Sequence, residues 1–135
     1  WPSLLTLAGI GEDEPNELAV TSTVRAHFCE LVAEQAGLQA EHTDIYLMGL
    51  FSLIDAFMDA PMEEVLRELP LAEPVKDALL GHASRYSVIL QLALAYEEAQ
   101  WEQCDTLAAR LGLHHEMPPA LYHRALHTAN QIFYD

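Results

Sequence analysis

The stretch 42–58, HTDIYLMGLFSLIDAFM, most constrains the fold of this chain, because apolar side chains surround nearly the whole helix that it predicts. A helix that is apolar on almost every side belongs inside a domain rather than on its surface. The stretch is too short and too often interrupted by polar residues to span a membrane. The sequence therefore predicts a central helix over 42–58, around which the rest of the chain packs.

Three acidic side chains share one narrow stripe of this predicted helix, at about 100° per residue. They are Asp44, Asp55 and Asp59, with Ser52 nearby. Two interpretations are open: a metal or acid–base site, or an N-cap region followed by a thin solvated strip. We favour the solvated strip.

Gly49 lies in the middle of the same predicted helix. Glycine costs about 1 kcal/mol there relative to alanine. We therefore expect a packing role, in which the missing side chain lets a neighbouring helix approach closely.

Helix formers dominate the chain, while β-branched residues are sparse and never form an alternating run, so we expect an all-α fold. The ends of the predicted helices are marked by caps, glycines and prolines, among them Asn16 as an N-cap, Gly37 as a stop signal and Pro118 at the start of the last helix. The predicted ranges are 1–9, 17–36, 42–58, 62–69, 75–80, 84–100, 101–112, and 118 onward. This pattern predicts one domain over 1–135, a compact bundle of about seven or eight helices with short connections.

The formal net charge of −15, from 21 acidic and 6 basic residues, limits the possible partners. Nucleic acid and anionic membranes attract clustered lysine and arginine, whereas the basic residues here are scattered. We expect neither as a partner. Cys29 and Cys104 are far apart and form no CxxC pair, and no signal peptide opens the chain, so we expect reduced thiols in a cytoplasmic protein.

Histidines suggest a test for metal binding, because imidazole is a common metal ligand. His123 and His127 are four residues apart on the last predicted helix and share a face, and His42 precedes Asp44 by two residues. These four are weak metal candidates, because the sequence contains no HEXXH motif. It also contains no GxSxG, Walker A or GxGxxG motif, so we expect no resident metal, no cofactor and no catalytic residue.

The segment 95–113, AYEEAQWEQCDTLAARLGL, looks like the turn between the two helices of a tetratricopeptide unit. A solenoid needs about three such repeats to bury its faces, and one copy is visible. A peptide-binding array of this kind is therefore our third hypothesis for the function.

Several segments, in their order along the chain, resemble the HDOD domain of bacterial proteins that join an EAL domain to a modified HD-GYP domain. The matching motifs are EPNEL at 14–18, VRA at 24–26, CE at 29–30, GLFSLID at 49–55, PMEE at 61–64 and LPL at 69–71. The GLFSLID, PMEE and LPL series is quite specific to this group. The resemblance covers nearly the whole chain.

This resemblance implies a helical fold related to HD-domain phosphohydrolases, but without their catalysis. HD enzymes hold metals through histidine and aspartate ligands that include an adjacent His-Asp pair. This chain has no such dipeptide and no GYP motif, and His42-Thr43-Asp44 has one residue inserted. The upstream EAL domain of such proteins looks like a phosphodiesterase for cyclic di-GMP, and it is itself degenerate in many members.

The resemblance thus predicts a non-catalytic regulatory domain, the C-terminal part of an HDOD domain, that binds its own EAL domain or another signalling protein. The expected interaction residues are the acidic rim Glu63, Glu64 and Glu68, and the apolar Trp1, Leu4 and Leu5. Because the first helices of a full HDOD domain are missing from this sequence, we expect uncovered apolar surface and possible homo-oligomers. The second hypothesis is a divergent HD-type metal phosphohydrolase that uses His42 and Asp44.

Overall fold

The computed structural model describes residues 16–134, which form a bundle of α-helices and short 3-10 turns without a strand. Its elements are α2 (Glu17–Gln35), η1 (Gln39–Glu41), α3 (His42–Leu50), η2 (Phe51–Leu53), α4 (Ile54–Met58), α5 (Met62–Arg67), α6 (Glu73–Leu79), α7 (Arg85–Glu97), α8 (Trp101–Arg110) and α9 (Met117–Tyr134). The prediction of an all-α, compact bundle is confirmed. No helix in this described part is long and apolar enough to cross a membrane.

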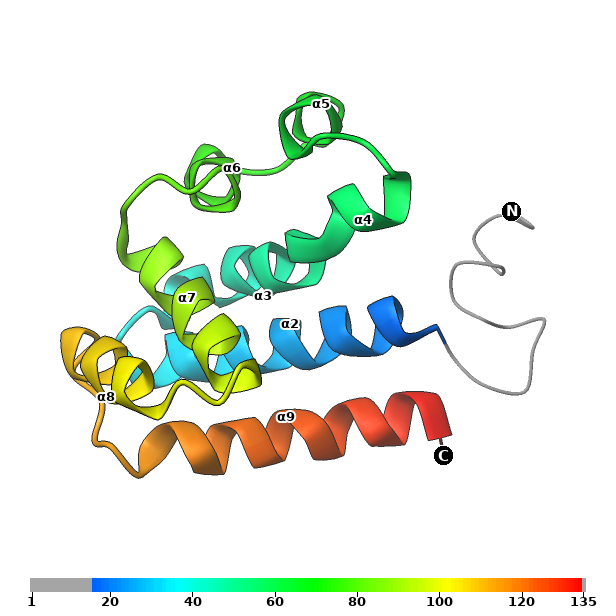
Figure 1. Cartoon of the computed structure of the whole chain (residues 1–135). Coiled ribbons are helices and arrows are strands. Elements are labelled where there is room, and N and C mark those ends of the chain that lie inside the picture. The colour runs from blue at the N-terminus through cyan, green and yellow to red at the C-terminus, as the bar shows by residue number, and fades with distance from the viewer. Residues whose placement is uncertain (1–15, 135) are drawn as a thin grey trace.

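Helix α2 lies at the centre of the bundle and packs against α3, α7 and α9 (Figure 1). Its start is capped as predicted, because the side-chain oxygen of Asn16 accepts hydrogen bonds from the backbone N–H groups of Leu18 and Ala19 at 2.7 and 3.4 Å. After the helix, Gly37 adopts the left-handed conformation expected of a stop signal, with φ of +81°. Helix α2 is therefore the element that joins α3, α7 and α9.

The prediction of one continuous buried helix over 42–58 is wrong. The stretch divides into α3, the 3-10 turn η2 and α4. The hydroxyl of Ser52 donates to the carbonyl oxygen of Gly49 at 2.7 Å, so it competes with the backbone bond that would continue the helix. Ile45, Met48 and Gly49 are buried in α3, whereas no residue of α4 is buried and Met58 is 58% exposed.

Gly49 allows α3 to approach α2 closely, as the sequence predicts. A Cβ atom built on Gly49 would lie 2.8 Å from the Cα atom of Ala26 and 2.8 Å from the carbonyl oxygen of Arg25. Both are backbone atoms of α2, which cannot rotate aside as a flexible side chain can. The two helix backbones are thus in direct contact at this point.

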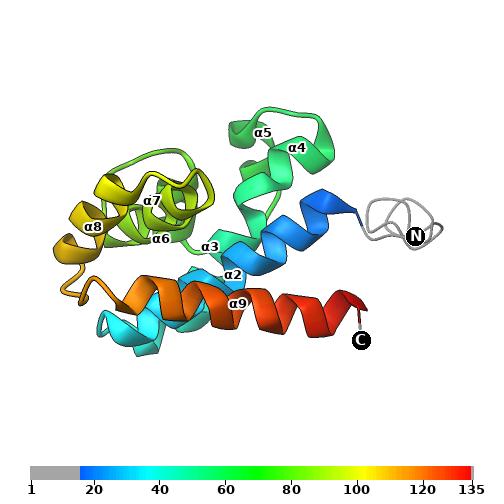
Figure 2. The same ribbon diagram turned by 60° about the horizontal axis from the view of Figure 1, so that its bottom comes forward.

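The second half of the chain completes the bundle with a hairpin and one long helix. Helices α7 and α8 pack against each other, and α9 runs back along α2 in the opposite direction (Figures 1 and 2). Helix α7 begins at a capping box in which Ser84 and Ser87 exchange side-chain to backbone hydrogen bonds of 3.1 and 2.8 Å. Because the hairpin shares its core with α2 and α9, it is part of one bundle and does not stack as a tetratricopeptide array.

Replacing Gly49 by leucine is expected to destabilise the fold by about 3 kcal/mol or to prevent folding, since overpacking commonly costs about 1–3 kcal/mol and backbone atoms block this site. Gly49→Ala, with one added carbon, is expected to lower stability by a smaller amount. Urea unfolding followed by circular dichroism measures both. Gln91→Leu, which adds a leucine at an exposed position of α7, is the control. An unchanged unfolding midpoint in Gly49→Leu would contradict the close contact.

Candidate functional site

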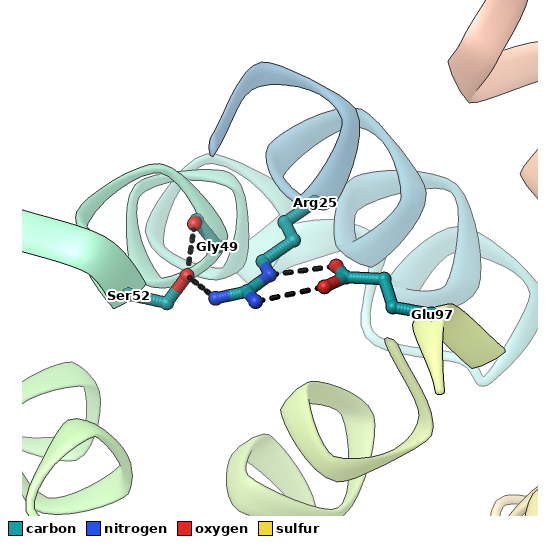
Figure 3. Close-up of polar contacts among 4 residues, drawn as sticks. All are labelled: Arg25, Gly49, Ser52 and Glu97. Atoms are coloured by element: carbon teal, nitrogen blue, oxygen red, sulfur yellow. Dashed lines mark hydrogen bonds and ion pairs between the residues drawn. The ribbon is translucent and has the colours of Figure 1, made fainter. Parts of the chain in front are cut away.

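The most organised polar group of the structure joins α2, η2 and α7 around the side chain of Arg25. The guanidinium of Arg25 donates from Nε to Oε2 of Glu97 at 2.6 Å and from Nη2 to Oε1 of Glu97 at 2.7 Å. Its remaining nitrogen Nη1 donates to the hydroxyl oxygen of Ser52 at 3.1 Å, and that hydroxyl donates onward to Gly49 (Figure 3). We call Arg25, Glu97, Ser52 and Gly49 the polar junction.

The polar junction is largely buried, with the Arg25 and Glu97 side chains only 12% and 20% exposed. The planar guanidinium matches both oxygens of one carboxylate, an arrangement that is shorter and stronger than a neutral hydrogen bond. Every nitrogen of the guanidinium has a partner, and both carboxylate oxygens are occupied. Because these groups satisfy one another, the junction connects helices and leaves neither charge free for a substrate.

Four aromatic rings extend from the core beside the junction towards the surface. Phe28 is fully buried and lies 5.4 Å from Tyr122, Tyr122 lies 4.6 Å from Tyr96, and Tyr96 lies 5.2 Å from Trp101, all between ring centroids. Burial raises the pKa of Tyr122, and the nearby carboxylate of Glu97 raises it further. The rings therefore begin in the core near the polar junction and reach solvent at the other end.

Cys29 lies in the core next to the junction. Burial raises the pKa of its thiol from the ordinary 9.0 to about 12, with Arg25 lowering and Glu97 raising it to smaller extents. Cys104 is also free and buried, and burial raises its pKa as well. A reactive cysteine needs a lowered pKa and solvent access, so both thiols act as small apolar side chains.

His27 and Tyr46 form a second contact between α2 and α3. Their rings meet edge to face at 5.2 Å, and Nδ1 of His27 lies 3.6 Å from Oε1 of Glu30. Burial raises the pKa of Tyr46, and the charge of Glu30 adds to that effect. Within the described part of the chain, Nε2 of His27 is buried without a hydrogen-bond partner.

The weak metal candidates lie apart on two helices. His42 is exposed at the start of α3, where its Nδ1 lies 2.8 Å from the carbonyl oxygen of Gln39. Asp44, two residues later in the same helix, is half-buried. His123 and His127 are both exposed on α9. Across residues 16–134, no group of three or more histidine, cysteine or acidic side chains is arranged to hold a metal ion.

The acidic stripe predicted on 42–58 is interrupted by η2. Asp44 lies in the first turn of α3 and Asp55 in the first turn of α4, where its carboxylate accepts from the backbone N–H of Ala56 at 3.0 Å. Asp59 is exposed in the left-handed conformation that ends α4. The two helices therefore do not form the single ridge that the metal interpretation requires.

The expected interaction residues divide into two groups. Glu63 and Glu64 are exposed in the first turn of α5, and Glu68 is exposed directly after that helix. The other three expected residues lie outside the described part of the chain, namely Trp1, Leu4 and Leu5.

Sequence reasoning missed the polar junction. Glu97 lies 72 residues from Arg25, and no local spacing connects them. One signal was present: Arg25 is the only arginine or lysine in α2, and its neighbours Val24, Ala26 and Phe28 are apolar. A solitary arginine among core residues indicates a buried partner, because an unpaired buried charge is costly.

Comparison with known proteins gives two similar proteins from different bacteria. Cyclic di-GMP phosphodiesterase CdgJ of Vibrio cholerae is 34% identical over 110 residues, which is 82% of this chain. A Bacillus subtilis protein called uncharacterized protein YuxH is 35% identical over 109 residues, or 81% of this chain. The chain spans about a quarter of each, 26% of their length. No family model and no solved structure matches the chain.

Removing one partner of the junction is expected to destabilise the fold strongly, because the other charge stays buried without compensation. Glu97→Gln is expected to lower the free energy of unfolding by about 3 kcal/mol. The double variant Arg25→Met with Glu97→Leu is expected to recover more than half of that loss, since no charge remains to be desolvated. Urea titration measures both.

The matched control is Glu98→Gln, the same change at the exposed neighbour of Glu97, which is expected to shift stability by no more than about 0.5 kcal/mol. A loss below about 1 kcal/mol in Glu97→Gln would show that the pair is weaker than its geometry indicates.

The raised pKa of Cys29 predicts two effects. At pH 8 Cys29 should react with dithionitrobenzoate only as fast as the chain unfolds, and 4 M urea should expose it.

The second effect concerns the stability of the fold. The pKa of Cys29 is higher in the folded chain than in the unfolded chain, so the protonated thiol contributes fully to the free energy of unfolding below about pH 9. That contribution is lost as the pH rises towards 12, by about 1.4 kcal/mol per pH unit. Cys29→Ala should make that part of the pH profile less steep, and the raised pKa values of Cys104, Tyr46 and Tyr122 contribute to the slope that remains. Rapid labelling of Cys29 at pH 8 without urea would contradict the assignment.

Proposed function

We propose that this chain is a non-catalytic regulatory domain of HDOD type, within a longer signalling protein whose activity concerns cyclic di-GMP. The observation that carries the proposal is the match with CdgJ. It covers most of this chain but about a quarter of the relative, which is named as a phosphodiesterase. The larger remainder of such a protein has room for a separate catalytic domain, which the HDOD resemblance implies is an EAL domain. The activity then belongs to that domain, and this chain acts on it or on another signalling protein.

The arrangement of charged residues supports a role in binding rather than catalysis. The buried charges of Arg25 and Glu97 form an ion pair with each other, and this pair holds α2, η2 and α7 together. Most of the remaining acidic residues lie outside the core, where they give the surface a strongly negative character. Such a surface selects partners by charge and accelerates their association.

The proposal includes a cytoplasmic location and an HD-related fold. Two free, buried cysteines on different helices suit a reducing compartment. The resemblance and the all-α bundle support the fold relationship, and a solved structure of CdgJ would test it directly.

Metal content and hydrolysis test the non-catalytic role. The chain is purified without a histidine tag and never exposed to nickel, and metals are measured by inductively coupled plasma mass spectrometry. Hydrolysis of cyclic di-GMP is followed by chromatography with and without EDTA, with CdgJ as the positive control. We expect neither stoichiometric metal nor hydrolysis.

A rate that EDTA abolishes, and that His42→Ala and Asp44→Ala both reduce, would overturn the proposal in favour of the divergent phosphohydrolase. His82→Ala and Asp77→Ala, a second histidine and aspartate near the surface, are the matched controls.

For the regulatory role, the remainder of the parent protein is added to the isotope-labelled chain. Amide shifts on one face of the bundle are expected, and their absence would contradict binding.

A further inference from the structure

The exposed end of the α7–α8 hairpin carries a large aromatic side chain that the core does not need. Trp101 opens α8 and is 56% exposed, although tryptophan is among the most costly side chains to leave in water. Its ring is nevertheless held in place, because it meets Tyr96 edge to face at 5.2 Å and Tyr96 packs on Tyr122. A fixed, exposed ring loses little conformational entropy on binding, which is the property of an interface anchor.

Three acidic residues lie close to Trp101 in the sequence. Glu98 is the C-cap residue of α7, three residues before Trp101. Glu102 follows Trp101 directly, and Asp105 lies one turn further along α8, on the same face as Trp101. All three are exposed, and none forms an ion pair with another residue of the range 16–134. We call Trp101, Glu98, Glu102 and Asp105 the tryptophan corner.

We propose that the tryptophan corner binds a basic segment of a protein partner, with an arginine or lysine of that segment over the Trp101 ring. Tryptophan is the best aromatic partner for a cation, and the three carboxylates add attraction for further positive charges. This inference rests on the proposed function, since it gives an interaction domain a surface and its partner a chemistry.

Charge also decides among the other possible occupants. A second copy of this chain would bring the same three carboxylates to face their counterparts, which is unfavourable between like charges. Nucleic acid and anionic membranes are repelled for the same reason, by a chain of net charge −15. A cationic protein segment is the occupant that the charges favour.

The test uses a synthetic probe, a 14-residue amphipathic peptide of leucine and arginine, and a control peptide with glutamate in place of arginine. The sequence contains two tryptophans, Trp1 and Trp101, so Trp1→Phe leaves Trp101 as the only indole fluorophore. The arginine peptide is expected to change the emission of Trp101, and added salt should weaken the effect. The glutamate peptide should have no effect.

Calorimetry then compares dissociation constants among variants. Trp101→Ala, and separately Glu102→Lys with Asp105→Lys, are expected to weaken binding of the arginine peptide by at least about tenfold. Glu64→Lys with Glu68→Lys makes the same change of charge on the acidic rim at α5, and Tyr134→Ala removes another exposed aromatic ring. The dissociation constants of both variants should stay within about twofold of that of the unmodified chain. Circular dichroism and the unfolding midpoint show that each variant is folded.

Equal weakening by the two double-lysine variants would overturn the proposal, because attraction would then depend on total charge alone. Absence of binding, or an unchanged constant in Trp101→Ala, would also overturn it. A dimer by sedimentation velocity that Trp101→Ala dissociates would assign the corner to a second copy instead. The proposed function is judged separately by metal content and hydrolysis, so a chain that neither hydrolyses nor binds the peptide refutes only the corner.

Discussion

The side chain and the backbone of Arg25 together determine how three helices meet. Its carbonyl oxygen lies against Gly49 of α3, at a distance that leaves no space for a Cβ atom. Its guanidinium reaches Ser52 of η2 and both carboxylate oxygens of Glu97 at the end of α7. The close approach of α3 therefore depends on glycine, and the position of α7 depends on the ion pair. A change in either contact alters the surroundings of the other.

A buried ion pair does not make a fold stable by itself, because desolvation of the two charges offsets much of their attraction. Its effect here is one of selection. Apolar cores tolerate repacking at modest cost, whereas a bidentate pair with a third donor to Ser52 keeps all its bonds only when α2, η2 and α7 hold this arrangement. The junction thus favours the observed placement of α7 on α2, and α7 leads into the turn and helix α8 that carry the tryptophan corner.

Local signals in the sequence were sufficient for most helix ends. Asn16 caps α2, Pro118 lies in the first turn of α9, and Gly37 follows α2 in the left-handed conformation, as their residue types predict. Gly49 was correctly assigned to a close helix contact. The break at η2 was missed because the Ser52 hydroxyl bond to the carbonyl of Gly49, which competes with the helical backbone bond there, leaves no trace in hydrophobic periodicity. The polar junction was missed because its partners are distant in sequence and become neighbours only through the packing of α2 with α7.

The prediction that 42–58 forms the centre of the molecule failed for a related physical reason. Counting apolar residues treats every one as core, but a chain of this size exposes much apolar surface, and Met58 is part of it. For the same reason, a single exposed apolar residue is not by itself evidence of a binding site. Trp101 differs because three further rings support it from the core and exposed acidic residues lie close to it in the sequence. Through Tyr96 and Tyr122, this surface residue is in packing contact with the core beside Arg25 and Glu97. A partner bound at the proposed corner would therefore contact a ring that packs on Tyr96 and, through it, on Tyr122.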